Sequence, residues 1–397
     1  MATPTLVVLY GEKVVKVRID AGVPLKEVIR QLCASSQLSV DGSPAHFALR
    51  EKTTGVLATE ESFPTLLLSG NGFRLVPSPA VEAQEMVENL KATGNRKLAT
   101  FSLRTLLKET EFADQFLLQN GFAVLQQVIL QESGNILAYA LNSFLAIDGT
   151  AIDPALVPRL VQIIATQPMV NVVRPAMSIL ARITLSSLDT LPPSLQSPTS
   201  STPHSGPAFL TIYQHLQDEP AFIPALVDQL NAPDVETRSF CLDLINALFQ
   251  GSIQSGQDFA GELEVHGAWE TLHLRIASPQ SADSPALLTF QSHLVASFHQ
   301  TLSTKLRPEY YPLFDSIWTA SELDDIDERN RWRRLGFKSE GPQVEFEEVG
   351  LLGLKALANV ADVHQPDFAR VRSTSSSRVH FAHFGCADDQ GSARSPR

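Results

Sequence analysis

The chain has 397 residues, of which 44% are hydrophobic, so it is long enough for two or three domains with ordinary cores. Its 31 basic and 43 acidic residues give a net charge of −12, which disfavours non-specific binding to nucleic acid or anionic membranes but allows local basic patches. Cys33, Cys241 and Cys386 are far apart and form no CxxC pair, which excludes a disulfide framework and a zinc site built from thiolates.

The N-terminus has no basic segment followed by a long apolar run. No apolar stretch reaches the roughly 20 residues that a membrane-spanning helix needs. We therefore expect a cytoplasmic protein, in which Cys33 and Cys241 lie among apolar helix residues and are buried.

Residues 1–78 have the pattern of a small α+β domain. Residues 5–10 and 14–19 are rich in β-branched side chains and flank a tight turn at Gly11, which predicts a β-hairpin. An amphipathic helix is predicted over residues 24–35, with Pro24 in its first turn. Extended segments follow at residues 46–50, around residues 56–57 and at residues 72–76. This order of elements predicts a ubiquitin-like fold.

The second predicted strand divides its side chains between two faces. With a period of two, Val15, Val17 and Ile19 share one face, which we expect to be the core. Lys16 and Arg18 alternate with them on the other face. Lys13 precedes them at the turn.

Residues 80–304 are predicted to be helical and to repeat. Residues 154–164 (PALVPRLVQII) and 220–230 (PAFIPALVDQL) lie 66 residues apart and share two prolines at the same spacing and a Leu-Val pair. A second helix with apolar residues at i, i+4 and i+7 follows each copy: Val173, Met177 and Leu180, then Phe240, Leu244 and Ala247. Stacked two-helix units of this kind predict an armadillo-like α-solenoid, whose concave surface typically binds another protein.

Three further segments differ from the helical repeats. Residues 189–208 are rich in Pro and Ser and nearly uncharged, which predicts a disordered insert. Residues 305–372 contain an apolar helix over residues 350–360 and indicate the start of another domain. Residues 373–397 show no apolar period and are predicted to be a disordered tail.

Segments in this order resemble the engulfment and cell motility (ELMO) family. Residues 24–33 and 47–60 are similar to its N-terminal GTPase-binding domain, and residues 78–87, 112–121 and 245–249 are similar to its armadillo-type region. A set of motif residues in this chain is similar to the opening of the ELMO domain: Arg334, Leu335, Gly336, Phe337, Pro342, Phe346, Gly350, Leu351 and Leu352. We expect these motif residues to be mainly structural.

The resemblance implies a non-enzymatic adaptor. Proteins of this family bind an active Rho-type or Arf-type GTPase through the N-terminal domain and a DOCK-type exchange factor through the C-terminal part. The complex activates Rac and remodels actin during engulfment and motility. The rest of the ELMO domain, the pleckstrin-homology domain and the Pro-rich tail of the family are not recognisable here. The resemblance therefore indicates a chain truncated within the ELMO domain and supports GTPase binding better than exchange-factor binding.

The resemblance also directs attention to the second strand. Ubiquitin-like GTPase binders often pair an edge strand with the sheet of the GTPase, and basic side chains on that strand meet acidic effector residues. Lys13, Lys16 and Arg18 are the candidate GTPase-binding residues, with Arg30 on the following helix a weaker candidate. The alternative is that these cations form only a solvated strand face.

A second hypothesis is an enzyme that activates GTP hydrolysis. Some relatives with an ELMO domain use an arginine just after an acidic-Phe pair, where it stabilises the charge on the transferred phosphate. Here Glu345-Phe346 is followed by Glu347 and Glu348, which would repel phosphate. We therefore predict no such activity.

A third hypothesis is a general armadillo scaffold that binds a peptide or protein in its concave groove. No phosphate-binding loop, GxSxG elbow or HExxH helix is present, and no cofactor is expected. His380, His383 and Cys386 have side chains that bind zinc but lack a fourth ligand, so no metal site is expected.

Overall fold

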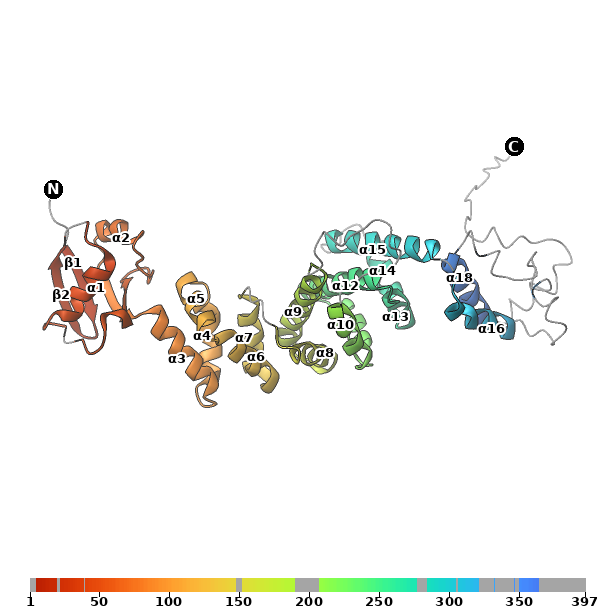
Figure 1. Ribbon diagram of the computed structural model, residues 1–397, viewed down its shortest axis with the longest axis horizontal. Coiled ribbons are helices and arrows are strands. Elements are labelled where there is room, and N and C mark those ends of the chain that lie inside the picture. Colours follow the sequence, from red (N-terminus) through yellow and green to blue (C-terminus); the bar gives the residue numbers. More distant parts are fainter. Residues whose placement is uncertain are drawn as a thin grey trace, which may run out of the picture. The chain divides into compact units, whose positions relative to one another are not determined.

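The structure is a computed structural model that describes residues 5–19, 22–38, 40–147, 152–189, 207–276, 284–304, 306–320, 332, 346 and 350–363. The chain divides into two compact units. The first comprises Met1–Gly251 and Glu262–Asp283, and the second comprises Ser252–Gly261 and Ser284–Arg397. In Figure 1 the sheet lies at the N-terminal end of the first unit, and the helix α3 follows it.

The first unit begins with a four-stranded sheet in the order β2-β1-β4-β3. Its strands are β1 (Thr5–Tyr10), β2 (Lys13–Arg18), β3 (Phe47–Glu51) and β4 (Phe73–Pro77). β1 runs antiparallel to β2 and parallel to β4, and β3 runs antiparallel to β4. The predicted ubiquitin-like α+β domain is therefore confirmed, with β2 and β3 at the two edges of the sheet.

Helix α1 (Leu25–Ala34) follows the first hairpin, as predicted, and covers one face of the sheet. Its apolar stripe packs against the inward residues of the strands. The core residues from these elements are Leu25, Val28, Ile29, Leu32, Leu6, Val8, Val15, Leu49, Phe73 and Leu75.

The sequence prediction missed one helix in this domain. Helix α2 (Phe63–Ser69) buries Phe63 and Leu67 in the same core. The short extended run that was predicted around residues 56–57 adds no strand to the sheet, because Leu57 forms only an isolated bridge with Arg50.

Beyond the sheet, the helices of the first unit pack in two layers. In one layer α4 lies against α7 and α7 lies against α9, while in the other α3, α6, α8 and α11 follow one another. This arrangement confirms the predicted armadillo-like solenoid. The helices after the sheet are α3 (Pro79–Lys91), α4 (Arg96–Leu106), α5 (Thr110–Leu118), α6 (Gly121–Gln131), α7 (Gly134–Leu145), α8 (Leu156–Thr166), α9 (Val170–Asp189), α10 (Pro207–Gln217), α11 (Phe222–Leu230), α12 (Val235–Ser255), α13 (Phe259–Val265) and α14 (Ala268–Ile276).

The two similar segments form the equivalent helices α8 and α11, which pack against each other. Pro158 and Pro224 occupy the first turn of each helix, where a missing backbone N–H costs nothing. The predicted two-helix unit was incomplete, because α10 lies between α9 and α11 in the chain and packs on both α8 and α9. Its buried stripe is Phe209, Ile212, Tyr213 and Leu216.

Arginines stabilise the C-terminal ends of several helices. The last carbonyls of a helix have no intrahelical donor and carry the negative end of its dipole. Arg96 donates to Leu90 O and Lys91 O at the end of α3, at 2.8 and 3.0 Å. Arg159 donates to Glu132 O after α6, and Arg182 donates to Phe144 O and Leu145 O in α7. Each arginine therefore ties one helix to the end of another.

The second unit contains helices α15 (Ser284–Ser303), η3 (Pro308–Tyr310), α16 (Tyr311–Ala320) and α18 (Gly350–Val363). Helix α18 packs on both α15 and α16. Aromatic rings form the centre of this core, since Phe314 lies 5.4 Å from the ring of Trp332 and 5.7 Å from that of Phe346.

Candidate functional site

Strand β2 is the element to which the sequence directs attention. Among the described strands it pairs only with β1, so its other edge has backbone donors and acceptors that no described strand uses. Edges of this kind can accept a strand from another protein. The structure therefore supplies the free edge that strand addition requires.

The alternation predicted for β2 is present. Val15 is 5% exposed and packs in the core, while Lys16 and Arg18 are exposed on the face opposite α1. Lys16 lies opposite Val7 of β1 and Arg18 lies opposite Thr5, and neither cation has an ion-pair partner in the described part of the chain. Their charges are therefore available to a partner.

Lys13 differs from the other two candidates. It is on the side of β2 that also holds Val15, and its Nζ donates to Leu38 O at 3.0 Å. This hydrogen bond ties the hairpin to the segment after α1. Arg30 is also engaged, because it makes two hydrogen bonds to Glu27, at 2.8 and 2.6 Å.

The exposed surface around Lys16 and Arg18 continues across the sheet. We name it the outer sheet face, and it comprises Thr5, Val7, Leu9, Val14, Lys16, Arg18 and Arg74. Val14 is 56% exposed, so the face combines apolar and basic groups. Arg74 on β4 lies opposite Leu9 and was missed in the sequence, although it alternates with the buried Phe73 and Leu75.

At the other edge of the sheet, the corresponding cation is used within the chain. Arg50 of β3 makes two hydrogen bonds of 2.7 Å to Glu109 and one of 3.1 Å to Glu82 of α3. Burial raises the pKa of Glu82, although Arg50 acts in the opposite direction. This cluster fixes the ubiquitin-like domain to the first helices of the solenoid.

The ELMO-domain motif divides between described and undescribed residues. Phe346 and Leu351 are buried in the aromatic core of the second unit, and Leu352 is half-buried. Arg334, Leu335, Gly336, Phe337 and Pro342 lie outside the described residues, as do Glu345, Glu347, Glu348 and the tail. Of the insert predicted over residues 189–208, residues 190–206 also lie outside them, whereas α9 extends to Asp189 and α10 begins at Pro207, so the predicted bounds were too wide.

The close approach of α18 to α15 explains why residue 350 is a glycine. Its φ is +55°, and a Cβ at this position would lie 1.9 Å from Leu302 O at the end of α15. The backbone of α18 approaches α15 so closely that only glycine fits. Leu351 N then donates to Thr304 O at 3.3 Å.

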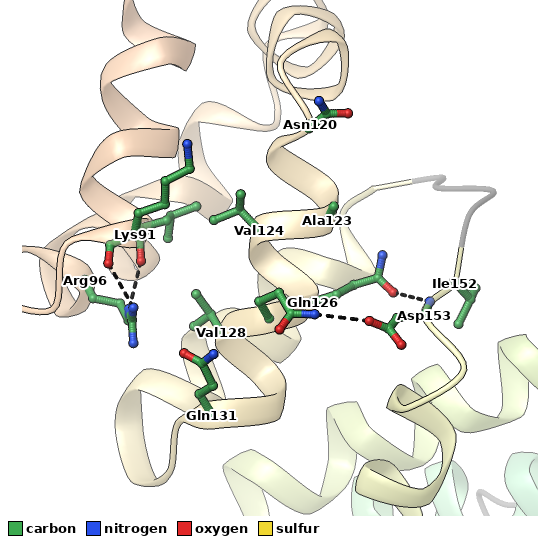
Figure 2. A pocket seen from close by; sticks show the side chains of 12 residues that line it. Lys91, Arg96, Asn120, Ala123, Val124, Gln126, Val128, Gln131, Ile152 and Asp153 are labelled. Carbon is green, nitrogen blue, oxygen red and sulfur yellow. Dashed lines mark hydrogen bonds between the residues drawn. The ribbon is translucent and has the colours of Figure 1, made fainter.

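A pocket of about 580 Å³ lies between the end of α3, the start of α4 and helix α6. Figure 2 shows the side chains that line it. Several of the polar groups that line it are hydrogen-bonded within the chain. Gln126 accepts a hydrogen bond from Asp153 N at 2.6 Å (Figure 2). Gln127 donates to the Asp153 carboxylate at 3.1 Å. Arg96 points its guanidinium at the end of α3. These contacts hold helices together and leave no converging reactive groups in the pocket.

Metal sites, membrane-spanning helices and reactive thiols can be assessed for the described residues. Those residues bring no three metal-binding side chains together, and none of their helices is long and apolar enough to cross a bilayer. His380, His383 and Cys386 lie outside them. Cys241 is buried and Cys33 is half-buried, and burial raises the pKa of both thiols.

The fold defines an armadillo-like helical protein that carries a ubiquitin-like domain at its N-terminal end. Comparison with known families matches residues 111–266 to the ELMO armadillo-like helical domain and residues 293–387 to the ELMO/CED-12 family. Engulfment and cell motility protein 2 from Bos taurus is 25% identical over 414 residues, an alignment that covers 92% of this chain and 53% of the relative. Engulfment and cell motility protein 1 from Homo sapiens is 22% identical over 417 residues, an alignment that covers 92% of this chain and 54% of that relative.

A further relative shares a shorter region. Ankyrin repeat and ELMO domain-containing protein D from Dictyostelium discoideum is 27% identical over 144 residues, which cover 35% of this chain and 11% of that protein. The chain belongs to the engulfment and cell motility family. It spans about half the length of the engulfment and cell motility proteins that it matches.

Proposed function

We propose that this chain is a non-enzymatic adaptor that binds an active small GTPase of the Rho or Arf type through the outer sheet face and the free edge of β2. The observation that carries this proposal is the combination of an edge strand, which no described strand pairs on its outer side, with Lys16 and Arg18, whose charges have no partner among the described residues. Membership of the family supports the same class of function.

The geometry suits strand addition. An edge strand of the GTPase would extend the sheet through main-chain hydrogen bonds, which supply affinity without regard to sequence. Lys16 and Arg18 would pair with acidic side chains beside that strand, while Val14 and Leu9 offer apolar contact. Dependence on GTP follows because the γ-phosphate orders the switch segments next to the edge strand of a GTPase.

The downstream role belongs to the same proposal. We propose that the GTPase-bound chain acts in the cytoplasm with a DOCK-type exchange factor to activate Rac and remodel actin. This step rests on the family relationship, and the chain covers about half of its relatives. Co-precipitation of the full chain with such an exchange factor tests it, and failure to recover the factor would limit the function to GTPase binding.

The first experiment uses the full chain against a panel of Rho-type and Arf-type GTPases loaded with a GTP analogue or with GDP. We expect binding only in the GTP-analogue state, and the Lys16→Glu/Arg18→Glu variant to weaken it by about tenfold or more, because reversed charges repel the acidic partner. Hydrolysis of GTP by the bound GTPase should not accelerate.

A matched control changes the same charge elsewhere in the domain. Lys26 and Lys52 are exposed but lie outside the outer sheet face, so Lys26→Glu/Lys52→Glu should bind the GTPase as the unmodified chain does. An equal loss of GTPase affinity in both double variants would contradict the proposed site. If no GTPase binds in either nucleotide state, the general scaffold becomes the better hypothesis, and accelerated GTP hydrolysis would establish the enzyme instead.

A further inference from the structure

Helix α4 has an exposed surface that the proposed GTPase contact does not use. Lys97, Phe101 and Arg104 follow the i, i+4, i+7 spacing and are all exposed, so they form one line along the helix. Lys108 lies in the turn that follows α4 and is also exposed. Leu98, beside this line, is 73% exposed.

An aromatic pair links this surface to the next helix of the layer. The ring of Phe101 lies 5.2 Å from that of Tyr139 on α7, at an interplanar angle of 74°. Edge-to-face contact of this kind fixes the ring of Phe101 although 60% of the residue is exposed. We call the set Lys97, Leu98, Phe101, Arg104, Lys108 and Tyr139 the α4 stripe.

The cations of the α4 stripe are not neutralised by the chain. Lys97, Arg104 and Lys108 form no ion pair within the ranges that the structure describes, and neither α4 nor α7 contains an acidic residue. Glu109 follows Lys108 directly, but Arg50 holds its carboxylate. The chain has a net charge of −12, and α3, which packs on α4, carries glutamates, so this basic surface is a local feature.

We propose that the α4 stripe binds an acidic segment of a partner protein that carries an aromatic or aliphatic side chain among its carboxylates. Phe101 and Leu98 supply a fixed apolar contact, and Lys97, Arg104 and Lys108 flank it with positive charge. Aromatic anchors surrounded by complementary charges are the usual centre of a protein interface. This site is on the solenoid and is separate from the outer sheet face.

A peptide fits the α4 stripe better than a polyanion does. Stable binding to nucleic acid or to an anionic membrane needs a larger basic cluster, which for a membrane has about four to eight cations. The net charge of −12 on the chain also opposes binding to a polyanion. The α4 stripe offers three cations around two apolar side chains. It therefore suits a short segment in which carboxylates and an apolar residue alternate.

The test selects peptides from a displayed random library on the immobilised full chain and measures their affinity by fluorescence anisotropy. We expect enriched peptides to contain Asp or Glu around an aromatic or aliphatic residue, and Lys97→Glu/Arg104→Glu to weaken them by about tenfold or more. Phe101→Ala should weaken the same peptides, because it removes the apolar contact without changing charge.

The controls separate this site from the GTPase site. The Lys16→Glu/Arg18→Glu and Lys26→Glu/Lys52→Glu variants should bind the selected peptides as the unmodified chain does, and circular dichroism should show that all variants are folded. Enriched peptides without acidic bias, or peptides that bind Lys97→Glu/Arg104→Glu equally well, would overturn the proposal. So would tighter binding of phosphatidylserine vesicles or a single-stranded oligonucleotide that depends on the same two cations.

Discussion

On the outer side of the ubiquitin-like sheet, Arg50 of β3 and Arg18 of β2 are the same residue type on opposite edge strands, yet their surroundings differ. Arg50 is held by Glu82 and Glu109, and only 14% of its side chain is exposed. Arg18 is exposed, and no described acidic residue pairs with it. One edge of the sheet is thus attached to the solenoid while the other stays available.

The same contrast recurs on α4. Arg96 is 8% exposed and connects the end of α3 to Glu132, whereas its neighbour Lys97 and Arg104 are exposed and unpaired within the described ranges. Cations that the chain neutralises itself hold elements together, and we propose that those left unpaired within the described ranges mark surfaces for partners. Substitutions of paired and unpaired cations test this division.

Arg96→Ala should be the most destabilising of these changes. It leaves two helix-end carbonyls and a partly buried carboxylate without their donor, which we expect to cost about 2–3 kcal/mol of unfolding free energy. Denaturant unfolding measures the loss, and hydrogen exchange should show faster opening at the end of α3. Lys97→Ala is the matched control and should be neutral. Equal losses for both variants would break the distinction between paired and unpaired cations.

Arg50→Ala should have the next largest effect, about 1–2 kcal/mol at neutral pH, because it removes a bidentate contact to Glu109 and the bond to Glu82. Arg50→Lys should be intermediate, since lysine keeps the charge but not the forked geometry. Lys52→Ala, at an exposed neighbouring position, should leave stability unchanged.

The effect of Arg50→Ala should also depend on pH. Burial raises the pKa of Glu82 above 4.5, so the folded state binds more protons at this group than the unfolded state does. The stability that Glu82 contributes therefore falls as pH rises from 4.5 through its raised pKa. Without Arg50 the pKa of Glu82 rises further, and the penalty grows between acidic and neutral pH. Urea unfolding at about pH 4 and pH 7 measures the difference. A penalty of equal size at both values would show that Arg50 acts through packing alone.

Asp234 offers a smaller test at the start of α12. Hydrogen bonds from the side chain and backbone of Thr237, with Arg174 as a weaker contributor, lower its pKa from 3.8 to about 2. The stability that this carboxylate contributes is therefore present above about pH 3.8 and is lost as pH falls through about 2. An NMR titration should show that Thr237→Val raises the pKa of Asp234 more than Arg174→Ala does. The reverse order would make Arg174 the dominant contact.

Sequence patterns predicted those parts of the molecule that depend on local spacing. The alternation in β2 placed Val15 inside and Lys16 and Arg18 outside, and the apolar stripe of α1 predicted its buried face. Helix α2 was missed because its short Leu-rich run has no clear period. Arg74 could have been found, since it alternates with buried neighbours in β4.

The remaining contacts join residues that are far apart in the chain. Arg50 meets carboxylates 32 and 59 residues away, and Lys13 bonds to a backbone carbonyl 25 residues away. Nothing in local composition distinguishes such a cation from one that is free. The division between paired and unpaired cations, and with it the α4 stripe, therefore required the structure.

The smallest effect on stability should come from Lys16→Glu/Arg18→Glu. Their cross-strand neighbours Val7 and Thr5 are uncharged, and the two side chains are exposed, so reversal should change the unfolding free energy by no more than about 0.5 kcal/mol. The same variant should lose binding to the GTP-bound GTPase, while Arg50→Ala loses stability first. A thermal melt and a binding titration on one preparation give both quantities. If the double variant unfolds as readily as Arg50→Ala, the free edge of β2 is maintained by its cations, and its loss of GTPase binding would no longer identify a contact surface.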